Sequence, residues 1–174
     1  DENGGAIYFD GESGTVKSSV FTNNTAASGS AIYWTKNNGK VNDCVFIDNP
    51  GDNAIYAPSD LNADYNWFGN NASNYNKNIA KVEGFTLNNW YFLNITLGQA
   101  AATINLNNVY NVLDATNSTN ENCALGNLNL TLIGENLTVQ DSAVLSKGVA
   151  DVPIAPVYKD LSLTASFGSA SYNK

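Results

Sequence analysis

Histidine, arginine and methionine are absent from the 174-residue sequence. Without histidine the chain can form neither a Ser-His-Asp triad nor a histidine-ligated zinc site, and without arginine it has no guanidinium group to clamp a phosphate. Charged residues are scarce, at 14%, and mostly acidic, so the net charge of -8 repels nucleic acid and anionic membranes. These absences count against ordinary enzymes and nucleic-acid-binding proteins. The lack of methionine predicts a cut fragment or a mature segment of a longer protein.

Long apolar runs and paired cysteine motifs are absent too. No stretch approaches the ~20 apolar residues of a membrane helix, and no basic-plus-apolar signal segment is found. Cys44 and Cys123 match no metal or redox spacing. Asparagine is abundant instead, at 29 of the 174 residues, together with 14 glycines. Because both residue types favour turns over helices, and 43% apolar content suffices for a core, we expect an all-β protein.

The N-terminal half repeats itself, which decides the architecture. The tripeptide Ala-Ile-Tyr begins at positions 6, 31 and 54, in steps of 25 and 23 residues. A second block keeps the same offset, with residues 15–24 aligned to 40–49 and a weaker copy at 64–71. This period, built from short strands and Asn/Gly turns, fits a right-handed parallel β-helix of about three rungs, a rung being one circuit of the chain. The leucine spacing of leucine-rich repeats is missing.

A β-helix places equivalent residues of successive rungs ~4.8 Å apart. Cys44 should then be a packed core thiol, and Asn24 and Asn49 should form an asparagine ladder. Tyr8, Tyr33 and Tyr56 form an aromatic stripe if they point outward, with ring faces open to sugar rings; a position inside the coil is the alternative. The expected core stacks are Ile7, Ile32 and Ile55; Val16 and Val41; and Phe21 and Phe46.

The order and spacing of these motifs also carry a resemblance. Gly-Gly-Ala-Ile-type blocks at 4–7, 29–32 and 52–55 alternate with Phe-x-x-Asn at 21–24, 46–49 and 68–71. The pattern resembles the repeats of polymorphic outer-membrane autotransporters and, more closely, the adhesin-like surface proteins of methanogenic archaea. Those proteins end their β-helix with a segment similar to 62–71 and continue into Ig-like modules. The resemblance covers about residues 1–84 and implies adhesion at a cell surface.

Trp67 and Phe68 would cover the open end of the β-helix, since an exposed rung leaves backbone and core unprotected; stacking on a ligand is the alternative. From about residue 85 the pattern changes to alternating apolar and polar residues, typical of strands with one buried face. We expect a hairpin turn at Gly134–Asn136 and an edge strand at Pro153 and Pro156. Roughly seven such strands predict an Ig-like β-sandwich over 85–174, following the β-helix over 1–84. The apolar positions of these strands are Tyr91, Leu93, Ile95 and Leu97; Ala102, Ile104 and Leu106; Leu128, Leu130 and Leu132; Leu137 and Val139; Ala143 and Leu145; Val152 and Ile154; and Leu161, Leu163, Ala165 and Phe167.

Catalytic chemistry is weakly supported. Pectate lyases and polygalacturonases share the β-helix scaffold, but such lyases use an acidic calcium cluster with a cationic base, typically arginine, and glycosidases need two facing carboxylates. No recurring acidic pair is found, so we interpret the acids of the repeats as solvated surface groups and expect no catalytic residue and no cofactor. Calcium at Asp48–Asn53, which offers carboxylate and amide oxygens, is the alternative. The acids in question are Asp10, Glu12, Asp43, Asp48, Asp52, Asp60 and Asp64.

Covalent modification leaves weaker signals. Lys147 and Lys159 are candidates for a Lys–Asn isopeptide bond, although exposed lysine is the usual state. A Cys44–Cys123 disulfide is disfavoured, because Cys44 should point into the coil. Sequons for N-glycosylation are hardly more frequent than the composition predicts, and they lie at Asn23, Asn71, Asn94, Asn117, Asn129 and Asn136.

Together these features predict an extracellular, cell-surface adhesin fragment without catalytic activity. It would attach to glycans or surface proteins of other microbial or host cells through a rigid β-solenoid, with the second domain as spacer. No nucleic-acid partner and no membrane insertion are expected. Two alternatives stay open: a fragment of a carbohydrate-active β-helix enzyme whose active rungs lie upstream, and a purely structural stalk or cell-envelope component.

Overall fold

The computed structural model describes residues 3–58, 60–69, 82–83 and 87–174. Over these residues the protein is all-β, as the composition predicts. In this part of the chain no helix is long and apolar enough to cross a membrane. The strands are β1 (Ile7–Phe9), β2 (Gly14–Lys17), β3 (Val20–Thr22), β4 (Ile32–Trp34), β5 (Gly39–Asn42), β6 (Val45–Ile47), β7 (Ile55–Tyr56), β8 (Val82–Glu83), β9 (Asn89–Leu97), β10 (Ala101–Asn111), β11 (Thr116–Thr119), β12 (Leu128–Glu135), β13 (Leu137–Val139), β14 (Ser142–Leu145), β15 (Val149–Pro156), β16 (Ser162–Phe167) and β17 (Ala170–Asn173).

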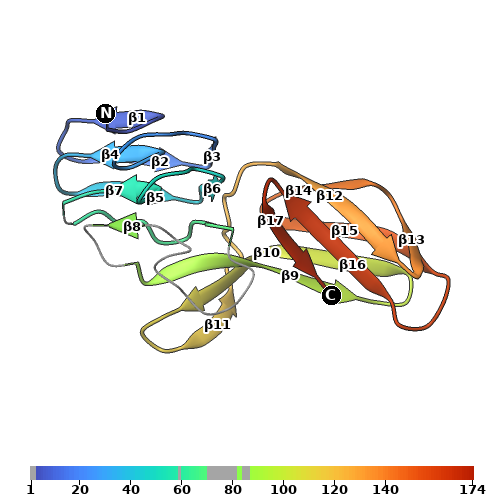
Figure 1. Cartoon of the computed structure of the whole chain (residues 1–174). Coiled ribbons are helices and arrows are strands. Elements are labelled where there is room, and N and C mark those ends of the chain that lie inside the picture. Colours follow the sequence, from blue (N-terminus) through green and yellow to red (C-terminus); the bar gives the residue numbers. More distant parts are fainter. Residues whose placement is uncertain (1–2, 59, 70–81, 84–86) are drawn as a thin grey trace.

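The first eight strands are short and pair in parallel, in layers stacked one above another (Figure 1). They form three sheets, ordered β1-β4-β7-β8, β2-β5 and β3-β6. Ile32 pairs with Ile7 on one side and with Ile55 on the other. Phe21 pairs with Phe46, and their rings stack with centroids 4.9 Å apart. The predicted stacking of equivalent core residues is therefore confirmed.

Left-handed backbone residues mark the corners between these sheets. Asparagine, aspartate and glycine tolerate this conformation better than other residues, which explains why they punctuate the repeats. At Gly29 (φ 58°) a Cβ would also collide with the carbonyl oxygen of Ile32, so glycine is required there. The equivalent corner residues are Gly4 and Gly29; Ser13, Asn38 and Asp60; Ser18, Asp43 and Tyr65; and Asn23 and Asp48.

Asparagine side chains tie the layers together at these corners. The Asn24 side-chain amide donates to Asn49 Oδ1 at 2.9 Å, and Asn49 Nδ2 donates to the Phe21 carbonyl at 2.9 Å. The predicted asparagine ladder is thus present. Asn66 repeats the device, accepting from the Cys44 backbone N–H at 2.9 Å. Cys44 itself is fully buried in the core of the repeats, as predicted.

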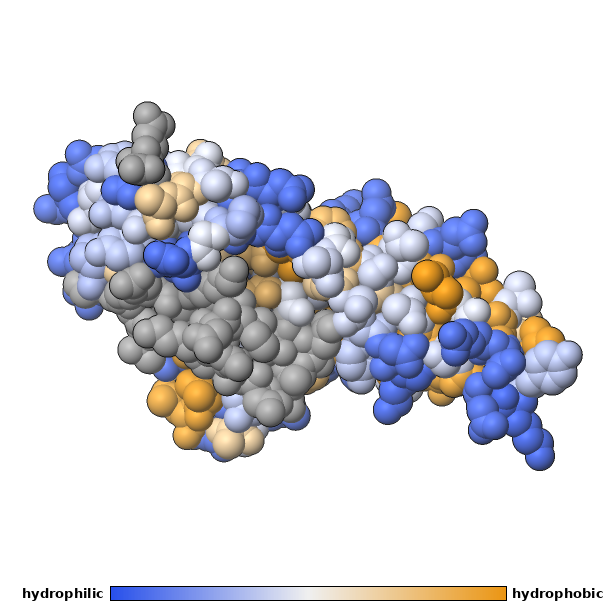
Figure 2. Space-filling model, in the orientation of Figure 1, coloured by the Kyte–Doolittle hydropathy of each residue, from blue (hydrophilic) through white to orange (hydrophobic). Residues whose placement is uncertain are grey.

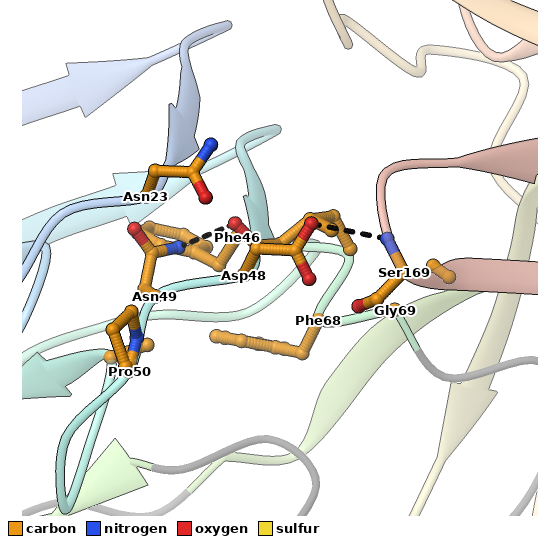
Figure 3. A pocket seen from close by; sticks show the side chains of 11 residues that line it. Asn23, Phe46, Asp48, Asn49, Pro50, Phe68, Gly69 and Ser169 are labelled. Atoms are coloured by element: carbon orange, nitrogen blue, oxygen red, sulfur yellow. Dashed lines mark hydrogen bonds between the residues drawn. The ribbon is translucent and has the colours of Figure 1, made fainter.

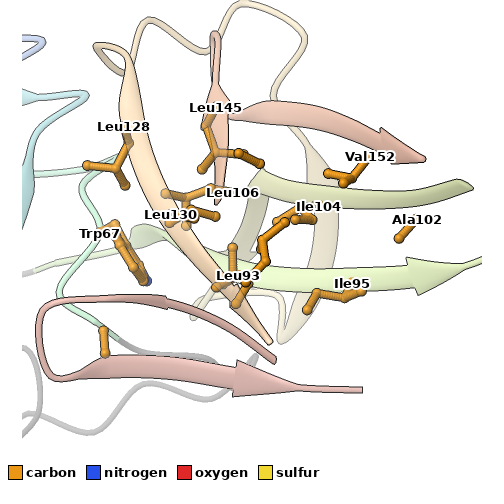
Figure 4. Packing of buried hydrophobic residues seen from close by; sticks show 14 of the residues in the cluster. Trp67, Leu93, Ile95, Ala102, Ile104, Leu106, Leu128, Leu130, Leu145 and Val152 are labelled. Atoms are coloured by element: carbon orange, nitrogen blue, oxygen red, sulfur yellow. The ribbon is translucent and has the colours of Figure 1, made fainter. Parts of the chain in front are cut away.

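Trp67 and Phe68 add a further layer below the second repeat. The Phe68 ring stacks on Phe46 with centroids 5.3 Å apart, and the Trp67 backbone N–H donates to the Cys44 carbonyl at 2.9 Å. Phe68 packs in the core of the repeats, whereas Trp67 belongs to the core of the C-terminal sheets (Figure 4). Both rings are buried, which suits a covering role and leaves little ring surface for a ligand.

Beyond residue 87 the strands pair antiparallel in two sheets, and the longest of them, β10, has 11 residues. One has the order β11-β10-β15-β13, with β9 also paired to β10; the other has the order β14-β12-β16-β17. Both contribute to one core, seen between them in Figure 4, which contains Leu93 and Ile104 from the first and Leu130 from the second. The apolar positions predicted from the alternation are those that face this core or pack at its margin. The predicted boundary between residues 84 and 85 lies outside the described residues.

Two expectations for this half are wrong. No hairpin forms at Gly134–Asn136, because β12 pairs with β14 and β16 while β13 pairs with β15. The chain changes sheets at Asn136 (φ 58°), a left-handed turn that serves this crossing as well as it would serve a hairpin.

The strand with the two prolines is not an edge, since β15 lies between β10 and β13. Pro153 is the last residue of β15 that pairs with β10, and Pro156 pairs with Leu137, the first residue of β13. The backbone N–H that each proline lacks is therefore missing only where a strand pairing ends. The exposed strand β11 was not predicted, because it has no apolar residue to reveal an alternation.

Candidate functional site

Tyr8, Tyr33 and Tyr56 form a row on the outer face of the β1-β4-β7 sheet. Each follows a core-facing isoleucine, and because side chains alternate along a strand the tyrosine points outward. Tyr8 pairs with Tyr33 and Tyr33 with Tyr56. The ring centroids lie 5.5 and 4.7 Å apart, with planes inclined by 3° and 15°. Tyr8 is 58% exposed and the other two are half-buried. The outward placement is therefore the right one, and we call this row the tyrosine ladder.

Parallel stacking changes what the tyrosine ladder can offer a ligand. Tyr33 lies between two rings, so its faces are covered, and the expectation of open ring faces is wrong for this residue. Desolvation between its neighbours, and next the proximity of Tyr56 and Tyr8, raises the pKa of the Tyr33 hydroxyl. The group is thus uncharged at neutral pH. Phenolic hydroxyls donate and accept hydrogen bonds, so the ladder presents a row of hydroxyl groups more than a stacking platform.

A polar cluster lies just beyond the ends of β1 and β4, the strands that carry Tyr8 and Tyr33. Thr35 Oγ1 donates to Asp10 Oδ1 at 2.8 Å, and Lys36 Nζ lies 3.5 Å from the same oxygen. The hydrogen bond from Thr35, and next the charge of Lys36, lowers the pKa of Asp10. The carboxylate and the ammonium balance each other, so this flank adds hydrogen-bonding groups to the surface without net charge.

A pocket lies where the end of β6 meets the β16–β17 turn (Figure 3). Its volume is about 540 Å³. Asp48 crosses it, with Oδ2 accepting from the Ser169 backbone N–H at 3.1 Å. Phe46 and Phe68 form an apolar wall but are almost wholly buried. The pocket therefore lies between the repeats and the C-terminal sheets, at the contact between Asp48 and Ser169. Its lining consists of Asn23, Phe46, Ile47, Asp48, Asn49, Pro50, Ala54, Phe68, Gly69, Ser169 and Ala170.

In the segment considered for calcium, Asp48–Asn53, three side-chain oxygens accept hydrogen bonds within the protein. Besides Asp48, Asn49 Oδ1 accepts from Asn24, and Asn53 Oδ1 accepts from the Gly29 backbone N–H at 2.6 Å. These amides close the ladder between repeats. Among the described residues no cluster of three or more acidic, cysteine or histidine side chains suits a metal. Calcium binding stays a hypothesis without a ready ligand set.

The interpretation of the acids as solvated surface groups is wrong for Asp43, which is buried. Only 7% exposed, it accepts hydrogen bonds on Oδ1 from the Tyr91 hydroxyl at 2.7 Å and from the Ala124 backbone N–H at 3.2 Å. Lys17 Nζ lies 3.6 Å from Oδ2. Through these hydrogen bonds the Asp43 side chain connects a corner of the repeats to β9 and to the loop before β12. Ser18 Oγ adds a further contact to this loop by donating to the Ala124 carbonyl at 2.5 Å.

Asp64 has a similar structural role, since its Oδ1 accepts from the Asn88 and Asn89 backbone N–H groups at 2.9 and 3.1 Å. Sequence reasoning missed these aspartates as connecting residues. The one available signal was position: Asp43 stands at a repeat corner where the preceding copy has Ser18.

The two thiols, Cys44 and Cys123, are free and buried. Burial raises the pKa of Cys44 from 9.0 to about 11; a backbone hydrogen bond with Ser19 lowers the pKa by a smaller amount, and the negative charge of Asp43 adds a smaller increase. Between these pH values the Cys44 thiol keeps its proton in the folded chain but has lost it in the unfolded chain. The contribution of this thiol to the free energy of unfolding is therefore fully present below about pH 9 and falls as the pH rises towards 11.

We therefore expect wild type to lose roughly 2–3 kcal/mol from this residue between pH 9 and 11, measured by urea unfolding across that range. The Cys44→Ala variant, although less stable at pH 8, should show a shallower decline, because the contribution of Cys44 is gone and only those of other groups with raised pKa values, such as Cys123, Tyr91 and Tyr33, are left. Parallel declines in the two proteins would contradict this assignment.

Four of the predicted sequons are exposed, at Asn23, Asn117, Asn129 and Asn136, and Asn94 is half-buried on β9. Asn71 lies outside the described residues. Lys147 and Lys159 are both exposed, which is the ordinary state of lysine and offers no buried environment for an isopeptide bond. Figure 2 also shows a hydrophobic patch over the β10–β11 turn, where Val112 and Leu113 are exposed.

In comparisons with known proteins, no family model, no curated protein and no solved structure matches the chain.

Proposed function

We propose that the chain is a non-catalytic binding segment of a cell-surface adhesin. In this proposal residues 1–84 form the last rungs of a right-handed parallel β-helix and residues 85–174 form an Ig-like β-sandwich that acts as spacer. The parallel registers at the repeat period and the stacked Phe21 and Phe46 rings support the first part. Two antiparallel sheets around one core support the second.

The tyrosine ladder is the observation that carries the binding role. Three stacked tyrosines at an exposed sheet face contribute little to the core, yet tyrosine occupies the same register position in the three successive strands β1, β4 and β7. Tyrosine supplies contact area and a hydrogen-bonding hydroxyl at low cost in side-chain entropy, which suits weak contacts repeated along a surface. The proposed partner is a glycan or surface protein on another microbial or host cell, met outside the cell.

The hydrogen bonds of three aspartates favour a binding role over catalysis. Asp43, Asp48 and Asp64 are each engaged by backbone N–H groups, so their carboxylates act as structural acceptors. A glycosidase requires two carboxyl groups that both face the substrate. The enzyme and stalk alternatives are kept as outcomes of the test below.

The test measures binding of the purified chain to whole cells and to a glycan array. We expect the Tyr8→Ala/Tyr33→Ala/Tyr56→Ala variant to lose at least tenfold in binding, the effect of ~1.4 kcal/mol. Tyr158→Ala, which removes a 72% exposed tyrosine elsewhere, is the matched control and should bind like wild type. Circular dichroism checks that both variants fold. Release of reducing sugar would indicate the enzyme, and absence of any binding by wild type would indicate the stalk.

A further inference from the structure

We infer that the tyrosine ladder binds a neutral, extended, β-1,4-linked glycan lying along the stack, with one sugar residue per tyrosine. This inference rests on the proposed binding role and adds the class of ligand. It follows from the spacing, the orientation and the charge of the ladder.

The spacing matches a linear glycan. Successive ring centroids are 5.5 and 4.7 Å apart, close to the advance of one sugar residue along an extended β-1,4-linked chain. A glycan running along the stack can therefore place one sugar beside each tyrosine. Successive β-1,4-linked sugars are turned over relative to one another, so equivalent hydroxyls meet every second tyrosine and hydroxyls of the opposite sugar edge meet the tyrosine between. An α-1,4-linked chain is helical, so its successive hydroxyls point in different directions. Such a chain cannot follow the straight row in which the parallel strands hold the three tyrosines.

The orientation of the rings selects the kind of contact. Because Tyr33 is stacked on both faces, a sugar meets ring edges and hydroxyl groups. Each phenolic hydroxyl donates one hydrogen bond and accepts others, and every sugar residue of the glycan carries hydroxyls that do the same. Hydrogen bonds repeated at a fixed interval reward the length of the ligand, as in any multivalent contact.

The charge excludes acidic glycans. The tyrosines are uncharged, and the neighbouring Asp10 and Lys36 pair with each other at 3.5 Å. No unpaired cation among the described residues of this flank is available to a uronate or sialate carboxylate. The net charge of -8 repels such chains further. A neutral ligand whose hydroxyls meet the tyrosine hydroxyls and the exposed Asp10 carboxylate fits this surface.

The experiment titrates the whole chain with β-1,4-linked glucose and N-acetylglucosamine oligomers of one to six sugars, with α-1,4-linked glucose oligomers as the matched ligand control. Affinity should rise roughly two- to tenfold per sugar up to three sugars, the effect of about one net hydrogen bond each, and then level off. Tyr33→Phe removes the middle hydroxyl but keeps the ring stack, so it should weaken the β-linked trimer by a similar factor. Tyr158→Phe should change nothing.

Equal binding of α-linked oligomers, affinity independent of length, or an unchanged Tyr33→Phe variant would overturn the inference. Tyrosine-dependent binding to cells without binding to any of these oligomers would also overturn it, while leaving the proposed adhesin role in place with a different partner. If wild type binds neither cells nor glycans, the proposed function is wrong as well.

Discussion

Replacing Trp67 by alanine is expected to lower the free energy of unfolding by about 3–5 kcal/mol. The indole is fully buried and packs in the same core as Val45 and Ile47 of the repeats and Leu93 of β9. Its backbone meanwhile pairs with Val45 of β6 and donates to the carbonyl of Cys44, the residue before β6. These neighbours come from several strands, and a packed core that is held on all sides cannot collapse into the cavity left by the indole.

Urea unfolding followed by far-ultraviolet circular dichroism measures this loss. Trp67→Phe should lose less, because it leaves a smaller cavity, and Val144→Ala should cost under about 0.5 kcal/mol, since Val144 is 54% exposed. Because one core contains residues from both parts of the chain, wild type should unfold in a single transition. A loss near that of Val144→Ala, or two separate transitions in wild type, would contradict the shared core.

The repeats made the first half predictable in detail. Identical tripeptides at near-constant spacing specify which residue lies over which, so the partners Ile7–Ile32–Ile55 and Phe21–Phe46 follow from the alignment alone. The direction of the tyrosines did not follow, because isoleucine and tyrosine can each face a core. In the structure the isoleucines fill the interior, and strand alternation then sends the tyrosines outward.

Contacts between the two halves could not be predicted from local pattern. Asp48 accepts from Ser169 across 121 positions, and Asp43 meets Tyr91 across 48. At a repeat corner an aspartate looks like ordinary turn material, and nothing nearby in the sequence names its distant partner. The same limit explains Asn136, where a turn signal gives a change of direction but does not say which sheet the next strand joins.

Asp43 joins the two halves through a buried cluster that should be costly to break. Its carboxylate accepts from the Tyr91 hydroxyl, which in turn accepts from Asn120 Nδ2 at 2.8 Å. Burial, and next the hydrogen bond to Asp43, raises the pKa of Tyr91, so this hydroxyl keeps its proton and acts as the donor. Removing Asp43 takes away the acceptor that the Tyr91 hydroxyl and the Ala124 N–H both donate to.

We therefore expect Asp43→Ala to lower the free energy of unfolding by about 2–5 kcal/mol, since two donors lose their acceptor, and Asp43→Asn, which keeps one acceptor oxygen, to cost less. A double-mutant cycle with Tyr91→Phe should give a coupling energy of about 1–3 kcal/mol, because the two side chains share one hydrogen bond. Asp10→Ala is the matched control: that carboxylate is largely exposed, and its pairs with Thr35 and Lys36 should be worth under about 1 kcal/mol. Additive effects of the Asp43 and Tyr91 substitutions, or an Asp43→Ala loss no greater than that of Asp10→Ala, would show that the two halves are held together mainly by the apolar core around Trp67.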